Sequence, residues 1–438
     1  MRFKAGQLQR FGCRKDLGIR RTITTCLVMA FCLAAAMMFL NCRQQQQQPA
    51  FVITPQIEIE PKFEVRVLLA GDVNRCTIKC PGGFSVQGAA GNTMVPDTIF
   101  GDTTLSMDIN VLGDEISIGG RNFATRELTI LPEAGQIFLF DGTAYRGKLV
   151  IKGNVDGLTF DAINVVPLEP YLAGVVGSEM PDYWEPEALK AQAIAARTYC
   201  LYNKAKFGPR RDWDVMKTTA SQVYRGLRAE SPMVWKAVNQ TSGQILVCRQ
   251  ANGNEEIFPT YYSSSCGGHT EDARNVFGDD LEPLRGVVCP YCKNIAKPNV
   301  FFWPMAQFAR DEVTLELQQK YPQLAGLGDI TGITVSKQSD YPDFSRSTMV
   351  KLTGSSGASD FVRAEDLRLT IDPSGNKIRS TNCKIILMGD RWVFSAGRGF
   401  GHGVGLCQCG AEGMARQGKS AAEILAYYYP GSKLTRVY

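Results

Sequence analysis

Residues 166–199 read VPLEPYLAGVVGSEMPDYWEPEALKAQAIAARTY, and within this stretch the pattern changes from strand to helix. The first helical segment has one apolar face at helical spacing, made of Leu168, Leu172, Val175 and Val176. Gly177 is placed to end that segment. Pro186 suits the first position of a second helix, and good helix formers continue to about Lys204. The sequence therefore predicts two consecutive helices in the middle of the chain.

Strand patterns precede these helices. Apolar residues alternate with polar ones from Phe63 onward, and Asp-Gly pairs at 141–142 and 156–157 separate apolar runs as tight hairpin turns do. Residues 61–166 are therefore predicted to form a β-rich N-terminal region.

The pattern after the helices is mixed. A loop-rich insertion is expected at 255–300, and strand patterns return from about 328 to 395. A Gly-rich loop and a short helix follow near the end of the sequence. The whole therefore predicts an α+β fold, with a helical centre between two β-rich regions.

The N-terminal segment differs from the rest in charge. Residues 1–21 carry a net charge of +6 against +5 for all 438 residues, so the remaining 417 sum to −1 and give no electrostatic footprint for nucleic acid. Residues 22–40 contain no charged side chain and are long enough to span a bilayer core of about 30 Å. We expect a signal anchor there, with a cleaved signal peptide or lipidation at Cys42 as alternatives. With 41–60 as a polar linker, the body is expected to work outside the cytoplasm.

Four residues of the insertion have the spacing of metal ligands. Cys266-x2-His269 is followed by Cys289-x2-Cys292, and paired ligands on either side of a loop suit tetrahedral zinc. Such a site would be closed and structural, with zinc stapling a segment that has little core of its own. The alternatives are disulfides, such as Cys266 to Cys289, or a thiol redox centre at Cys289 and Cys292.

Three ordered blocks give the chain a family resemblance. The blocks are the quoted stretch at 166–199, YYSSSCGGHTEDARNVFG at 261–278, and the ending at 397–431, GRGFGHGVGLCQCGAEGMARQG…EILAYYYPG. Together they resemble the SpoIID/LytB family of stage II sporulation protein D and amidase-enhancer proteins. We therefore expect residues 167–438 to form a SpoIID/LytB-like catalytic region.

The resemblance implies a cell-wall protein that acts on peptidoglycan glycan strands, with a cell-wall amidase as a possible partner. Characterised members are lytic transglycosylases, and the catalytic acid of their S-E-M-P segment corresponds to Glu179. Lys190, Gln192 and Arg197 stand where the family keeps polar residues that it needs, so we expect substrate or support roles for them. Many relatives carry a histidine where this chain has Ser263.

The chemistry expected of Glu179 needs one carboxyl group. A helix C-terminus and the apolar neighbours Met180 and Trp184 would raise its pKa, as a general acid near neutral pH requires. The acid protonates the glycosidic oxygen, and its carboxylate then takes the proton of the sugar's 6-hydroxyl, which closes to a 1,6-anhydro end. The alternative is a non-catalytic peptidoglycan-binding enhancer of an amidase.

The Gly-rich block GRGFGHGVG is not a dinucleotide site, because no βαβ unit follows it. Its glycines would let the backbone approach a glycan or the Glu179 segment closely. His402 and Gln408 are therefore predicted to lie at the cleft and to contact sugar.

Overall fold

The computed structural model describes residues 63–438 except 89–97, 101–104, 134–136, 251–252 and 343. The predicted leader, signal segment and linker all lie outside the described residues. Within the described residues, no helix is both long enough and apolar enough to cross a membrane. The described part mixes helices and strands, which confirms the α+β class.

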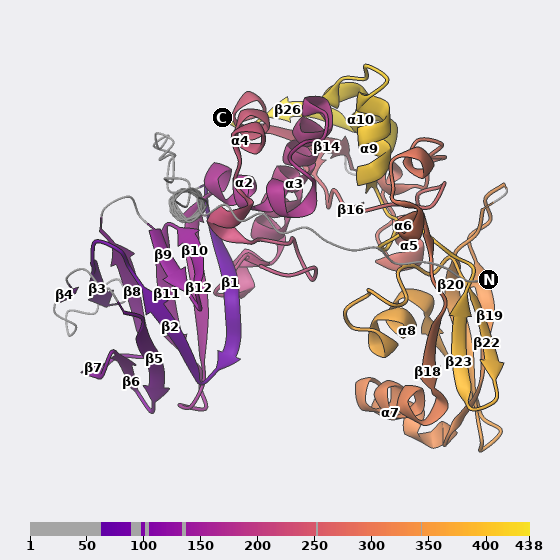
Figure 1. Ribbon diagram of the computed structural model, residues 1–438, viewed down its shortest axis with the longest axis horizontal. Helices are drawn as coiled ribbons and strands as arrows, with labels where there is room; N and C mark the ends of the chain where they lie inside the picture. Colours follow the sequence, from indigo (N-terminus) through magenta and orange to yellow (C-terminus); the bar gives the residue numbers. More distant parts are fainter. Residues whose placement is uncertain (1–62, 89–97, 101–104, 134–136, 251–252, 343) are drawn as a thin grey trace, which may run out of the picture. The chain divides into compact units, whose positions relative to one another are not determined.

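Two antiparallel-rich sheets form the N-terminal region, shown in indigo and purple in Figure 1. Their strand orders are β13-β1-β12-β11-β8-β3-β4 and β10-β9-β2-β5-β6-β7. The strands are β1 (Glu64–Val73), β2 (Arg75–Lys79), β3 (Phe84–Gly88), β4 (Thr98–Phe100), β5 (Met107–Leu112), β6 (Glu115–Ile118), β7 (Arg121–Phe123), β8 (Glu127–Pro132), β9 (Ile137–Phe140), β10 (Thr143–Arg146), β11 (Lys148–Gly153), β12 (Phe160–Pro167) and β13 (Val215–Met216).

The two Asp-Gly turns lie where the sequence places them. Asp141 and Gly142 both have positive φ and join β9 to β10, the conformation that a two-residue type I′ hairpin needs. Asp156 and Gly157 lie in the turn between β11 and β12, and the Asp156 carboxylate accepts from two backbone N–H groups of that turn. Both hairpin predictions are confirmed.

The helical centre consists of α2 (Leu168–Glu179), α3 (Pro186–Lys206) and α4 (Pro232–Gln240), with η2 (Gly208–Arg210) and η3 (Gly226–Ala229) between the last two. Pro186 opens α3 as predicted. Gly177 does not end α2, because the helix continues to Glu179. A Cβ at Gly177 would lie 1.8 Å from the Ala229 carbonyl oxygen, so glycine is needed there for close packing of η3 and not for a cap.

A second apolar core lies between residues 303 and 394. It is built from the sheets β18-β23-β22 and β19-β20-β21 with α7 (Arg310–Lys320), η6 (Pro322–Leu327) and α8 (Ala364–Ile371). The strands are β18 (Ala306–Ala309), β19 (Ile330–Gln338), β20 (Ser347–Gly354), β21 (Ser359–Arg363), β22 (Lys384–Met388) and β23 (Arg391–Ser395). The predicted return to strands is confirmed.

Before this second core comes a segment of short elements. They are β14 (Gln244–Arg249), β15 (Glu255–Ile257), β16 (Tyr262–Ser263), α5 (Ala273–Val276), η4 (Glu282–Leu284), η5 (Cys292–Asn294), α6 (Pro298–Phe301) and β17 (Phe302–Trp303). The predicted insertion at 255–300 is thus poor in regular structure.

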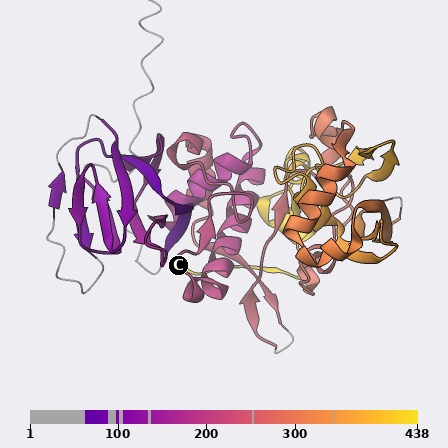
Figure 2. The same cartoon turned by 90° about the horizontal axis from the view of Figure 1, so that it is seen from below.

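The C-terminal segment returns to the helical centre. It consists of β24 (Gly397–Arg398), β25 (Leu406–Cys407), α9 (Gln408–Ala415), α10 (Ala421–Tyr428) and β26 (Lys433–Arg436). Strand β26 pairs with β14, and β25 pairs with β16. In Figure 2 this yellow segment runs beside the magenta helices. The return brings the third sequence block against the first two.

Candidate functional site

Glu179 is the last residue of α2 and its side chain is half-buried. Its Oε1 accepts a hydrogen bond from the Val223 backbone N–H at 2.8 Å, and its Oε2 accepts one from Gln408 Nε2 at 3.4 Å. Burial raises the pKa of Glu179 above its ordinary value, while these two donors and the charge of Arg225 act in the opposite direction. The carboxyl is therefore partly exposed, and its burial favours the protonated form. When it is charged, Val223 and Gln408 donate hydrogen bonds to it.

Gln408 and Gln192 lie behind this carboxyl. Gln408 opens α9, and its Nε2 is also 3.4 Å from Oε1 of Gln192 on α3. Both side chains are buried, and Gln192 Nε2 has no hydrogen-bond partner. The two amides form a buried chain behind the Glu179 carboxyl, which agrees with the support role expected for Gln192, and the sugar contact of Gln408 stays a prediction.

A second series of hydrogen-bonded side chains lies beside Glu179, and it was not predicted from the sequence. Gln222 accepts from the Tyr171 hydroxyl at 3.1 Å and donates to the Tyr262 hydroxyl at 2.9 Å. Burial, with the nearby charge of Glu179, raises the pKa of Tyr262 well above its ordinary value. No motif marks Gln222, although its neighbour Val223 supplies the backbone donor to Glu179.

His402 has both ring nitrogens occupied within the protein. Its Nε2–H donates to the Tyr262 carbonyl at 2.9 Å, and its Nδ1 accepts from the Val404 N–H at 3.0 Å. Burial lowers the pKa of His402 to about 4, so the ring is neutral, with its proton on Nε2. These two bonds tie the Gly-rich loop to β16, and a contact of His402 with sugar stays a prediction.

Arg197 is fully buried and cannot reach a substrate. Its guanidinium binds both oxygens of Glu169, which links α3 to α2, and donates to the carbonyls of Gln244 and Val238. Of the substrate and support roles expected for Arg197, these contacts favour structural support. Lys190 is half-buried and forms an ion pair with Glu187 at 2.7 Å, so its contact with substrate stays a prediction.

Four buried cysteines form a cluster that differs from the predicted set. The sulfur atoms of Cys266, Cys289, Cys292 and Cys407 all lie within 4.8 Å of one another, and all four thiols are free. Cys407 lies on β25, directly before Gln408. In the sequence Cys407 stands in a Cys-x-Cys pair with Cys409, but only the pairing of β16 with β25 shows that Cys407 lies beside the segment of Cys266.

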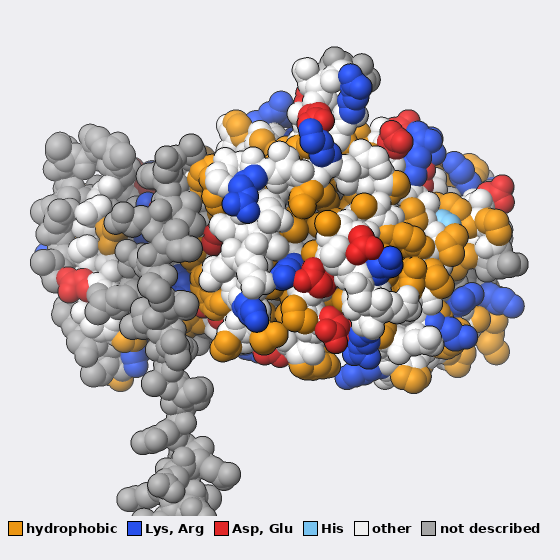
Figure 3. Space-filling view, turned by 90° about the horizontal axis from the view of Figure 1, so that it is seen from above, with side chains coloured by type: hydrophobic (Ala, Val, Ile, Leu, Met, Phe, Trp, Pro, Cys, Tyr) orange, Lys and Arg blue, Asp and Glu red, His pale blue; other side chains and the backbone are white. Residues whose placement is uncertain are grey.

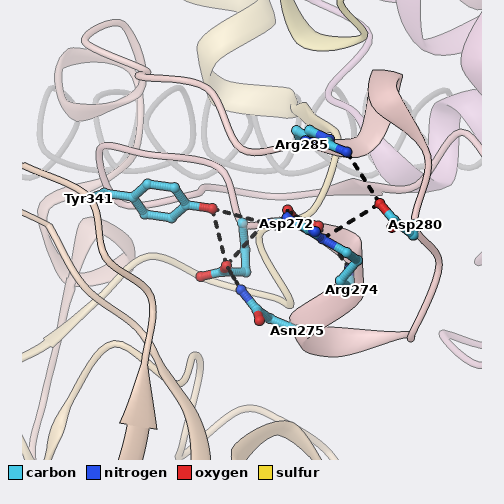
Figure 4. A network of polar contacts seen from close by, with 7 residues as sticks. Asp272, Arg274, Asn275, Asp280, Arg285 and Tyr341 are labelled. Atoms are coloured by element: carbon cyan, nitrogen blue, oxygen red, sulfur yellow. Dashed lines mark hydrogen bonds and ion pairs between the residues drawn. The ribbon is translucent and has the colours of Figure 1, made fainter.

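His269 is not a member of this cluster, which corrects the predicted ligand set. Its ring stacks on Tyr341 with centroids 3.7 Å apart, and its Nδ1–H donates to the Thr270 carbonyl. The Tyr341 hydroxyl is held in a polar network by Glu271 and Asp272 (Figure 4). His269 thus stacks on a residue of this network and is not among the residues whose ligand atoms lie together in the cluster.

The geometry of the cluster fits a tetrahedral metal. Zinc–sulfur bonds of about 2.3 Å place the sulfurs of a tetrahedral site about 3.8 Å apart. Cys266 Sγ and Cys292 Sγ are 3.7 Å apart, far beyond the ~2.05 Å of a disulfide. Contacts with the other three thiols lower the pKa of Cys292, whereas burial and contacts within the cluster raise the pKa of Cys266 and of Cys407. The donor set suits a closed, structural zinc site with four protein ligands.

Comparison with known proteins identifies the family. The family model described as Stage II sporulation protein matches residues 157–248, which contain Glu179 and Gln192. Stage II sporulation protein D of Bacillus subtilis is 31% identical over 290 residues, which cover 63% of this chain and 76% of that protein. This chain belongs to the stage II sporulation protein D family.

Two further proteins are similar to this chain over a comparable or longer stretch. An uncharacterized protein of Brachyspira hyodysenteriae is 36% identical over 294 residues, covering 67% of this chain and 73% of that protein. A protein of B. subtilis named amidase enhancer is 29% identical over 364 residues, covering 75% of this chain and 48% of that protein.

Proposed function

We propose that this chain is a peptidoglycan lytic transglycosylase of the bacterial cell wall in which Glu179 is the single acid and base. The observation that carries the proposal is the state of the Glu179 carboxyl, which is half-buried, raised in pKa and backed by two neutral donors. The family and the amidase-enhancer relative support a role in the cell wall during sporulation.

The proposed reaction uses Glu179 twice. The protonated carboxyl gives its proton to the glycosidic oxygen as the bond from that oxygen to the anomeric carbon breaks. The N–H of Val223 and the amide of Gln408 then stabilise the carboxylate that remains. That carboxylate takes the proton of the sugar's 6-hydroxyl, whose oxygen bonds to the anomeric carbon. The product is a 1,6-anhydro end, and Glu179 is protonated again.

The proposed route needs one carboxyl group, whereas hydrolysis needs two. Hydrolysing glycosidases use two carboxylates at a fixed separation. The hydrogen-bond partners of Glu179 are a backbone amide and a glutamine, which can stabilise its charged form but cannot act as a second acid or base. A reaction in which the sugar supplies its own nucleophile needs only the one acid.

Mass spectrometry of denuded glycan strands tests the proposal. The wild-type chain is expected to release anhydro-ended fragments, and Glu179→Gln is expected to release none above background. Asp182→Asn, an exposed change in the loop that follows α2, is the matched control and should leave turnover unchanged. Intact glycan after incubation with folded wild-type protein would contradict the proposal.

The second candidate is a non-catalytic enhancer, favoured by the relative that bears that name. It predicts that the wild type and Glu179→Gln bind glycan equally, that neither cuts it, and that both stimulate a cell-wall amidase to the same degree. Fragment release that depends on Glu179 excludes it.

We also propose that the four cysteines hold structural zinc and that residues 22–40 anchor an extracytoplasmic body. The zinc would join Cys407, next to Gln408, to the segment of Cys266–Cys292 and so fix the amide behind Glu179.

The face drawn in Figure 3 shows basic and acidic side chains interspersed, in keeping with a body near neutrality.

A further inference from the structure

Arg346 departs from a rule that the other buried arginines obey. Four arginines with at most 8% exposure are found among the described residues: Arg146, Arg197, Arg346 and Arg368. Three of them form an ion pair with a glutamate, namely with Glu230, Glu169 and Glu365 respectively. Arg346, at 1% exposure, forms no ion pair with any described residue, and its Nε has no hydrogen-bond partner.

The partners of Arg346 lie on the two segments that carry the cysteine cluster. Its guanidinium donates to the carbonyl of Cys266 at 2.7 Å and to that of Gly401 at 3.4 Å. A Cβ at Gly403 would lie 2.7 Å from the carbon of the guanidinium, so the glycine leaves room for the arginine. Arg346 therefore bridges the Cys266 turn and the loop that leads to Cys407.

A second arginine lies at the same turn. Arg398 is half-buried, lies near Gly268 and likewise forms no ion pair with a described residue. The guanidinium groups of Arg346 and Arg398 both lie 5.8 Å from the Phe344 ring centroid. Two positive charges thus flank the cysteine turn without carboxylate partners.

A buried guanidinium needs a negative partner because it does not lose its proton and is costly to desolvate alone. Glu271, on the same loop, uses its Oε1 for Asp272, Asn275 and Tyr341, and its Oε2 is buried without a hydrogen-bond partner, but it forms no ion pair with Arg346. Glu365 is close enough for the charge of Arg346 to help lower its pKa, but both of its oxygens bind Arg368. The further candidate is the cysteine cluster, since Arg346 binds the carbonyl of Cys266. Four thiolates around a divalent metal carry a net charge of −2, whereas disulfides or free thiols carry none.

We propose that Arg346, with Arg398 beside it, is the counter-charge of a dianionic tetrathiolate metal centre formed by Cys266, Cys289, Cys292 and Cys407. This rests on the proposed metal centre and adds a residue that sets its affinity and its charge state. Arg346 acts on the metal through its ligands, since it binds the Cys266 carbonyl, and it is a positioning residue.

Zinc competition against a chromophoric chelator, with the purified chain under reducing conditions, tests the proposal. Arg346→Gln removes the charge but keeps an amide donor, and it should weaken zinc binding by about 10- to 100-fold. Arg346→Lys keeps the charge and should stay within a few-fold of the wild type. Arg146→Gln removes a buried arginine with its own glutamate partner and should leave zinc affinity unchanged.

The outcomes separate the two proposals. A folded, fully reduced wild-type chain that takes up no zinc overturns the metal centre, and the charge proposal with it. Zinc uptake by the wild type with equal affinity in Arg346→Gln overturns the charge proposal alone, as does equal weakening in the Gln and Lys variants. Should Arg346→Gln fail to fold, Arg398→Gln at the half-buried site carries the test and should weaken zinc binding by a smaller factor.

Discussion

At the scale of the residue, Glu179 is set by two opposed effects. Burial favours the neutral acid, and the donors from Val223 and Gln408 favour the carboxylate. An acid that must first give and then regain a proton needs both, because either effect alone would trap one of the two states.

Replacing Gln408 should shift this balance in a known direction. Gln408→Leu removes a donor to the carboxylate, so the pKa of Glu179 rises further. The alkaline limb of the pH–rate profile should then move to higher pH, by about one unit at most, and kcat should fall about tenfold as proton donation becomes harder. Gln417→Leu, in the exposed turn that follows α9, is the control. An alkaline limb that moves to lower pH would refute this account.

The two histidines of the chain should make the fold sensitive to mild acid. Burial lowers the pKa of His402 to about 4 and also lowers that of His269, while an unfolded chain takes up these protons near pH 6.5. The stabilisation is therefore complete above pH 6.5 and declines as the pH falls from 6.5 towards 4. The melting temperature should drop more between pH 7 and 5 in the wild type than in His402→Gln. A His402 ring that titrates near 6.5 by NMR would contradict this prediction.

At the scale of the element, α2 is shaped by what packs on it. Gly177 lies within the helix, where alanine would ordinarily be preferred by about 1 kcal/mol. The Ala229 carbonyl 1.8 Å from the position of an added Cβ reverses that preference.

Gly177→Ala should therefore destabilise the protein by about 1–3 kcal/mol. Gly326→Ala is the matched control, because a Cβ there meets nothing within 4 Å and φ is not positive. Urea unfolding should show a lower midpoint for Gly177→Ala and little change for Gly326→Ala. Equal midpoints for the two variants would mean that η3 moves aside without cost.

Some elements were predictable from the sequence and others were not. The hairpins at 141–142 and 156–157 and the start of α3 at Pro186 were predictable, because neighbouring residues determine turns and helix starts. The end of α2 was not, since Gly177 serves close packing against a carbonyl about 50 residues away in the chain and not a helix cap.

The candidate site divides similarly. Glu179 was identified through a motif, and three of the four clustered cysteines through their spacing. The fourth, Cys407, depends on strand pairing between segments more than 100 residues apart, and local spacing placed His269 there instead. Likewise, nothing in the sequence indicated that Arg197 would be buried in an ion pair with Glu169.

At the scale of the whole molecule, the site is assembled from distant segments. Helix α2 supplies Glu179, α3 supplies Gln192, and the C-terminal segment supplies Gln408. The pairing of β25 with β16 and the cysteine cluster hold that last segment in place. Metal binding and the support of Glu179 should therefore be coupled through one peptide bond, between Cys407 and Gln408.

Metal removal should accordingly loosen the site before it unfolds the N-terminal sheets. With chelator, amide hydrogen exchange should increase in β25, α9 and η5. Strands β8, β11 and β12 should keep their protection, because they belong to the N-terminal sheet and do not pair with the strand that carries Cys407. Cys407→Ser should reproduce this pattern without chelator and bind zinc more weakly, and Cys200→Ser, a buried cysteine on α3 outside the cluster, should not. Uniform loss of protection across all strands would show that the metal stabilises the fold as a whole, and unchanged exchange in α9 would show that Gln408 is held without it.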